Sequence, residues 1–218
     1  MKSILFSLFL IVVSNASYGQ LYNIRLGGNA SLGGTLTTLT VANTQSDEDT
    51  SAVLASFMPI NVDITPWKFL SFNAGFKIGS WLNEDPNDDN IIIKQKTTSA
   101  IMFGFKLYPL MKDNFNLYFG YDLGIGGFKT VKETSGVFFV SEVQKWKGIN
   151  QNINFGMNWY FGGAFGMFFQ TGYTGYNLNL KEFTWNNEDQ MEAFDLSANM
   201  IVKGAQLELG FTYKIGGI

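Results

Sequence analysis

Six ionisable residues fall at positions that an alternating strand pattern turns to one side of a sheet. They are three cations and three anions: Arg25, Lys77, Lys106, Asp63, Asp122 and Glu208. The residues two positions away from each are mostly Asn, Gln, Thr or Gly. Charges removed from water stay ionised only when they are paired and hydrogen-bonded. We therefore predict that these six residues form a salt-bridge network in a confined interior.

Catalytic and metal chemistry has few candidates. The sequence contains no His and no Cys, so the usual general base, the commonest metal ligand and a thiol nucleophile are all missing. Its glycines lie within strand patterns and do not form a phosphate loop between a strand and a helix. Only Asp122 and Glu208 could offer a carboxylate pair. We predict a protein that is not an enzyme and has no cofactor and no metal site.

Acidic residues gather in the connecting segments, at 47–49, 84–85, 88–89 and 188–192. Clustered carboxylates can bind Ca²⁺, or divalent ions shared with lipopolysaccharide phosphates. None of these clusters has the glycine and the spacing of an EF-hand loop. Solvated loop charge is the interpretation that we favour.

The segment 22–37 shows best how such side chains would be positioned. Its even positions are mostly apolar and its odd positions are mostly Asn, Ser, Thr and Gly, which places one set on each face of a strand. Strands of soluble sheets usually have about five or six residues, whereas a tilted strand crosses a bilayer in about nine to eleven. The same pattern predicts seven further strands, at about 53–64, 69–82, 96–108, 115–130, 147–160, 165–180 and 196–215.

Two of these strands carry specific expectations about which side chains point outward. In the strand at 53–64 we expect Met58 on the apolar outer face with Ile60 and Ile64. In the strand at 165–180 the apolar residues change parity between Tyr173 and Tyr176. We interpret that change as a β-bulge near Gly175.

The low charge content of the sequence indicates which face of each strand points out of the barrel. Soluble domains carry about 25% charged residues, and this chain carries 15%. The interior of an eight-stranded barrel is just wide enough for side chains to fill. Small polar residues therefore suit the inside, and bulky apolar residues suit a lipid-facing outside.

The connections between the predicted strands alternate in length. Long ones, at about 41–52, 83–95, 131–146 and 181–195, alternate with short ones at 65–68, 109–114 and 161–164. Membrane barrels have short periplasmic turns and longer external loops. The predicted fold is all-β, an eight-stranded antiparallel up-and-down transmembrane β-barrel.

The N-terminal segment predicts export. Residues 1–19 carry Lys2, an apolar run and then small residues, which is the pattern of a signal peptide. Residues 20–218 would form the barrel domain. Without Lys2 the chain has 14 basic and 18 acidic residues, a balance of about −4 that gives no support to nucleic-acid binding.

Several phrases of the sequence are typical of one class of protein: MFGFKLYP at 102–109, LYFGYDLG at 117–124, GMFFQTGY at 166–173 and LELGFTY at 207–213. With them the chain resembles the outer-membrane β-barrel proteins of Gram-negative bacteria, the OmpA/OmpX-like and porin-family barrels. The resemblance implies a location in the outer membrane, contact with its lipid and lipopolysaccharide, and a monomer.

The function that we expect is non-enzymatic, either envelope structure or surface interaction through the external loops, with a plugged lumen. Two alternatives stay open: a narrow porin-like channel for ions or small solutes whose ion pairs exchange partners as a gate, and an accessory subunit of an envelope export machine. A strand-like part of the third long connection is the candidate binding site for a surface protein partner: Gly136, Val137, Phe138, Phe139 and Val140.

Overall fold

A computed structural model describes residues 21–41, 44–83, 91–134, 140–161 and 163–216. The predicted signal peptide, the acidic residues at 84–89 and the candidate partner residues Gly136–Phe139 lie outside the described residues. The strands are β1 (Leu21–Val41), β2 (Thr44–Trp67), β3 (Leu70–Asn83), β4 (Ile91–Met111), β5 (Phe115–Thr134), β6 (Val140–Tyr160), β7 (Phe165–Trp185), β8 (Glu188–Asp189) and β9 (Leu196–Ile215).

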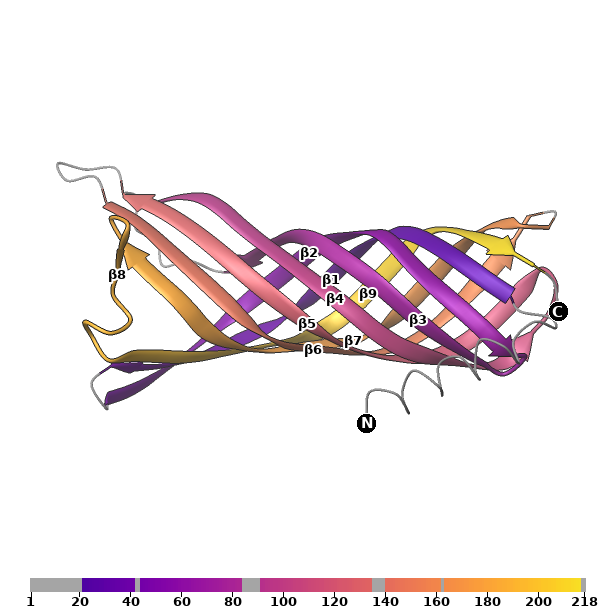
Figure 1. The fold of residues 1–218 in the computed structure, drawn as a ribbon, viewed down its shortest axis with the longest axis horizontal. Helices are drawn as coiled ribbons and strands as arrows, with labels where there is room; N and C mark the ends of the chain where they lie inside the picture. Colours follow the sequence, from indigo (N-terminus) through magenta and orange to yellow (C-terminus); the bar gives the residue numbers. More distant parts are fainter. Residues whose placement is uncertain (1–20, 42–43, 84–90, 135–139, 162, 217–218) are drawn as a thin grey trace, which may run out of the picture.

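Eight long strands close into a ring. Each of β1 to β7 pairs antiparallel with the next, β7 pairs with β9, and β9 pairs with β1, while the two-residue β8 only extends the edge of β7. The start of β1 and the end of β9 lie at the same end of the barrel as the short connections (Figure 1). The prediction of an eight-stranded antiparallel up-and-down β-barrel is confirmed.

No helix in the described part of the chain is long and apolar enough to cross a membrane.

The two faces of the wall carry opposite chemistry. Along β6 the exposed Ile153 and Phe155 alternate with the buried Asn152 and Asn154. The same alternation runs round the ring. We call the half of the barrel next to the short connections its lower half. Most large apolar side chains there are exposed, for example Leu26, Phe72, Phe103, Phe119, Ile153, Phe169 and Leu209. Such a surface is stable only in contact with hydrocarbon. We call this belt the apolar band.

The barrel continues well beyond the apolar band. On β7 the exposed side chains change to Asn177 and Asn179, while Tyr176 and Leu178 are buried. Along β7, the part beyond the band is therefore polar outside and apolar inside, as in a soluble barrel. Seven of the eight long strands have 20–24 residues, about twice the nine to eleven that a membrane crossing needs. The outer half of the barrel therefore projects into water.

The four long loops that we expected at this end are shorter than predicted, because strands extend into all four segments. The segment 41–52 is largely a β1–β2 hairpin whose described ladder ends at Val41 and Thr44, and β7 extends as far as Trp185. Polar segments that are rich in Thr, Ser and Gln pair as well as apolar ones when a neighbouring strand supplies a ladder. Polarity marked the end of the apolar band, and not the end of the strands.

The expected outward position of Met58 was also wrong. Between Met58 and Asn61 β2 has one residue more than β1, from Arg25 to Gly27, and the ladder with β3 shifts at the same place. This β-bulge contains Pro59, which has no N–H to donate. The bulge reverses the parity of the upper part of β2, so Phe57 points outward and Met58 inward.

The bulge that we expected near Gly175 does not exist. The ladders of β7 with β6 and with β9 run without a shift through the pairs that Gly175 makes with Gln151 and Lys203. Tyr176 simply continues the inward set. The change of parity in the sequence marks the height at which the outside becomes aqueous.

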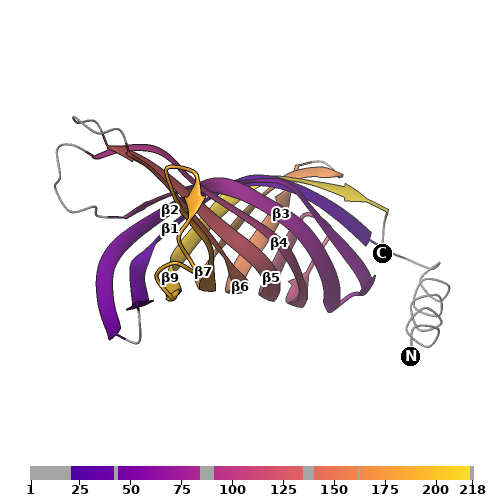
Figure 2. The same cartoon turned by 60° about the vertical axis from the view of Figure 1, so that its left-hand side comes forward.

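The ring is not closed over its full height. β3 and β4 pair only as far as Ser80 and Thr97. Within the described residues, the edge of β2 over 44–51 and the edge of β4 over 91–95 therefore have no second partner strand. Figure 2 shows the outer ends of β1 and β2 lying apart from those of β5 and β6.

The apolar band makes a direct prediction. Ile153→Lys, which places a cation at a side chain 62% exposed, is expected to lower the free energy of unfolding in phospholipid vesicles by about 2–4 kcal/mol, the cost of a cation near the bilayer midplane. Ser197→Lys, at an exposed site of β9 above the band, should change it by less than about 1 kcal/mol. Urea titration followed by tryptophan fluorescence measures both. Equal costs would contradict this placement of the membrane.

Candidate functional site

The structure places all six of the predicted charged residues inside the barrel. Five long strands besides β1 contribute to the set, and every member is at most 9% exposed: Arg25 (β1), Asp63 (β2), Lys77 (β3), Lys106 (β4), Asp122 (β5) and Glu208 (β9). The alternation of each strand aims its ion at the axis. The six lie at the height of the apolar band. Five of them form two ion-pair groups, and Asp122 is held by amides.

The first group is centred on Asp63, whose carboxylate is shared by two cations. The Arg25 Nε lies 3.1 Å from one Asp63 oxygen, and the Lys106 Nζ lies 2.6 Å from the other. Arg25 also donates to the Tyr118 hydroxyl at 2.9 Å and to the Asn158 side-chain oxygen at 2.8 Å. Its guanidinium carbon lies 4.6 Å from the Tyr118 ring centroid and 5.1 Å from that of Phe168. A planar donor can meet all these partners at once, which an ammonium group cannot do.

The second group joins Lys77 to Glu208 by an ion pair of 2.8 Å. The same carboxylate accepts hydrogen bonds from Asn29 at 3.1 Å and from Gln170 at 3.3 Å. Gln170 in turn accepts from the Tyr118 hydroxyl at 2.9 Å. Tyr118 therefore links the two groups.

Asp122 is held differently from the other anions. Its two oxygens accept hydrogen bonds from Asn73 and Asn154, each at 2.7 Å. Asn73 and Asp122 flank Gly104 in the ladder, and a side chain there would overlap the Asp122 carboxylate. Because β4 has a glycine here, Asn73 of β3 and Asp122 of β5 can bond across it. Two amides therefore satisfy the Asp122 carboxylate, which we had expected to form an ion pair.

The network fills the lumen at this height. The space left among the two groups has a volume of about 10 Å³, which is the room of about one water molecule. The Tyr118 ring occupies the place next to Gly156, where a Cβ would collide with its hydroxyl. Polar side chains thus close the barrel at its waist.

An apolar layer lies inside the lumen next to the network, on the side of the outer end of the barrel. The Phe128 ring packs between Trp81, at a centroid distance of 5.2 Å, and Tyr176, at 5.0 Å. The other members of this cluster are Leu54, Ala100, Met102, Trp146, Leu178, Leu180, Ala198, Met200 and Val202. The lumen is therefore closed by two successive layers of opposite polarity.

Beyond this layer the outer ends of the strands enclose a cup of about 570 Å³. Its lining is rich in aromatic rings, with a few charged residues, and includes Trp81, Trp146, Phe183, Trp185, Phe194, Lys96, Lys132 and Glu142. We call it the outer cup.

Of the candidate partner segment only Val140 is described, at the start of β6, where it pairs with Thr134 of β5. β5 is paired on both sides there, because Thr134 also pairs with Ile91. Among the described residues, β2 over 44–51 and β4 over 91–95 do have an edge without a second partner strand. In the described part of the chain no group of three or more Asp or Glu is arranged to hold a metal ion.

The sequence analysis did not single out the neutral partners of the network. Tyr118 and Asn158 have no charge to attract notice, yet they accept hydrogen bonds from Arg25, and the Phe168 ring packs against its guanidinium. Their signal is position: each lies on the inward set of its strand at the height of an ion.

Comparison with known proteins supports the fold. No family model matches the sequence, and no curated protein matches it. The structure is similar to the crystal structure of the outer membrane protein OprG from Pseudomonas aeruginosa, with a TM-score of 0.60 and 10% identity over 91% of this chain and 97% of that chain. It also matches Neisserial surface protein A (NspA), with a TM-score of 0.41 and 10% identity over 86% of this chain and 97% of that one. The outer membrane protease OmpT from Escherichia coli matches with a TM-score of 0.36 and 10% identity over 91% and 97%.

The chain thus has the fold of an outer-membrane β-barrel. This conclusion depends on the closed ring of eight antiparallel strands and on the likeness to OprG. The predicted resemblance to such barrels is confirmed at the level of the fold.

The buried network makes a second prediction. Arg25→Met removes one of the two cations that contact Asp63 and the donor to Tyr118 and Asn158. It is expected to lower the free energy of unfolding by about 3–5 kcal/mol, the cost of breaking a buried ion pair. In the double variant Arg25→Met/Asp63→Asn the loss should be smaller than the sum of the two single losses. The half-exposed pair Lys145–Glu182, also at 2.8 Å, is the control, since Lys145→Met should cost less than about 1 kcal/mol. Equal losses for Arg25→Met and Lys145→Met would refute a structural role of the network.

Proposed function

We propose that this protein is a closed, non-enzymatic barrel of the outer membrane that serves envelope structure or surface interaction through its outer end. The observation that carries the proposal is the double closure of the lumen. A polar network with about 10 Å³ of free space lies against an aromatic layer centred on Phe128. A passage for solutes would have to disrupt both.

The interior chemistry supports a role without catalysis. Asp122 and Glu208, the carboxylates that could act as an acid and a base, are each engaged by Asn or Lys donors and buried below the aromatic layer. A substrate could not reach them. The chain also lacks the histidine that general-base catalysis most often uses.

The surface supports an outer-membrane location and a monomer. The apolar band surrounds the barrel and would contact membrane lipid and lipopolysaccharide, which are the first partners that we propose. The ring of eight strands is complete at the height of the band. One chain thus satisfies its own backbone hydrogen bonds there, without a second subunit.

The outer end is the part best suited to a surface protein partner. The outer cup offers aromatic rings, which are enriched where proteins meet. Next to it, within the described residues, the β2 edge over 44–51 and the β4 edge over 91–95 present backbone groups without a second partner strand. An extended segment of a partner could add a strand to either edge. An accessory role in an envelope export machine would use this same surface, and cross-linking in intact cells tests for it.

A narrow channel is the second candidate, favoured by one contact. Because Asp63 is shared by Arg25 and Lys106, it could keep one cation while it releases the other. Such an exchange could open a path for ions past the network. The aromatic layer would still have to move.

Conductance across a planar bilayer separates the two candidates. The wild-type protein is expected to give no stable conductance. Tyr118→Ala/Phe128→Ala, which removes one large ring from each closing layer, is expected to conduct. Phe119→Ala, which removes an exposed ring from the neighbouring outward position, is the matched control and should stay closed. Steady conductance of the wild-type protein would overturn the closed barrel in favour of the channel.

A further inference from the structure

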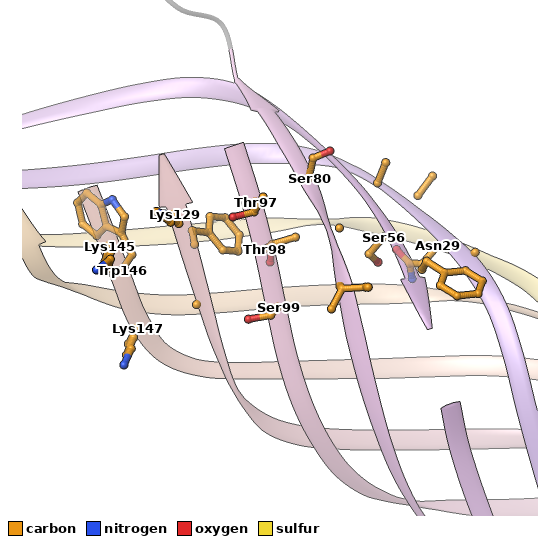
Figure 3. Close-up of a pocket in the computed structure, with 18 of the residues that line it drawn as sticks. Asn29, Ser56, Ser80, Thr97, Thr98, Ser99, Lys129, Lys145, Trp146 and Lys147 are labelled. Atoms are coloured by element: carbon orange, nitrogen blue, oxygen red, sulfur yellow. The ribbon is translucent and has the colours of Figure 1, made fainter. Parts of the chain in front are cut away.

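A large hollow lies on the outside of the barrel wall. It has a volume of about 1050 Å³ and crosses six neighbouring strands, β1 to β6, with Leu207 and Leu209 of β9 at one end. Figure 3 shows its labelled residues following one another across the strands, from Asn29 and Ser56 to Lys145 and Lys147. We call it the outer-wall groove.

The strand register explains how the groove forms. Its floor is the backbone of one ladder row that joins inward-facing residues: Asn29, Ser56, Gly79, Thr98, Phe128 and Trp146. The outward side chains one position before and after this row form its two walls. Several wall residues are small, such as Ala30, Ala55 and Ser99, and a Cβ on Gly28 would meet no atom within 4 Å. The wall is therefore hollowed between larger neighbours.

The two ends of the groove differ in chemistry. One end lies in the apolar band, among Phe57, Ile78 and Leu209, which are 43–54% exposed. The other end holds three lysines, Lys129, Lys145 and Lys147. Lys147 comes two positions after Lys145 and two before Ile149, an exposed residue at the rim of the band. The groove thus runs from the acyl region up to the height of lipid head groups.

The lysines at the upper end lack enough anions of their own. Lys129 and Lys145 are directly opposite in the β5–β6 ladder, and like charges in such a pair destabilise a sheet. Glu182 of β7 pairs with Lys145 at 2.8 Å and offsets one of the three charges. An anion between Lys129 and Lys147 would offset the rest.

We propose that the outer-wall groove binds a phosphate-bearing glycolipid of the outer leaflet, with an acyl chain along the floor and a phosphate between Lys129 and Lys147. The proposal rests on the outer-membrane location proposed above. An apolar trough that ends in cations complements an amphiphile that carries its negative charge at the head group. A zwitterionic lipid would gain little from the lysines, and free phosphate would gain nothing from the trough.

Native mass spectrometry of the full chain in detergent micelles doped with bisphosphorylated lipid A tests this site. Lys129→Gln/Lys147→Gln is expected to lower lipid A retention roughly 20-fold, because each lysine near a charged membrane surface contributes about fivefold. Lys68→Gln/Lys203→Gln is the matched control, since both residues are exposed lysines outside the groove and away from its lysine end. It removes the same charge and should leave retention unchanged.

A second pair of variants tests the trough without touching the lysines. Gly28→Leu/Ala30→Leu fills it and should lower lipid A retention at least fivefold, whereas Ala74→Leu, at an exposed outward position of β3 away from the groove, should not. Equal loss in the lysine variant and its control would overturn the site, as would equal retention of phosphatidylcholine and lipid A by the wild-type protein. The closed lumen is tested separately by conductance, which these outer-face substitutions do not affect.

Discussion

The pairing of the first long strand with the last is the constraint on which the whole structure depends. From Tyr22 opposite Ile215 to Val41 opposite Leu196, β1 and β9 close the sheet on itself. In hydrocarbon there is no water to satisfy an open edge, so closure has to be complete at the height of the apolar band. It is complete there, and the ring opens between β3 and β4 only above Ser80 and Thr97, where the outer surface is already polar. The opening and the limit of the apolar band thus both lie where the surroundings of the barrel change from lipid to water.

Closure with only eight strands also determines what the interior can be. The lumen is narrow enough for side chains from opposite walls to touch, as Arg25 of β1 does with Tyr118 of β5. Ions in such a space need partners, and asparagines, tyrosines and glycines at matching heights provide them or make room for them. The consequence is a barrel whose interior is a structural core. Its recognition chemistry is left to the surfaces: the outer cup, the unpaired edges of β2 and β4, and the outer-wall groove.

Periodicity predicted the strands, their number, their order and the inward position of all six ions, because a period of two is the same whether a strand is in lipid or in water. It misplaced Met58, since the extra residue at the Pro59 bulge leaves no mark in composition. It also misjudged Tyr176 and the long connections for one shared reason. Where the outside changes from lipid to water, the apolar residues lie on the inner face instead of the outer one. The sequence pattern then resembles that of a bulge or a loop, although the ladder continues. The amide partners of Asp122 depend on which positions meet across Gly104, and this register is not visible in one strand alone.

The central claim is that one wall separates lipid from a packed interior along its lower half and water from an apolar core along its upper half. The sequence has no cysteine, so single spin labels can be placed in vesicle-reconstituted protein without a background. Labels at Ile153→Cys and Phe155→Cys should collide with dissolved oxygen, labels at Asn152→Cys and Asn154→Cys should be shielded from both oxygen and a water-soluble relaxation agent, and a label at Asn177→Cys should meet the water-soluble agent. Shielded labels at 153 and 155 together with water-exposed labels at 152 and 154 would contradict the account.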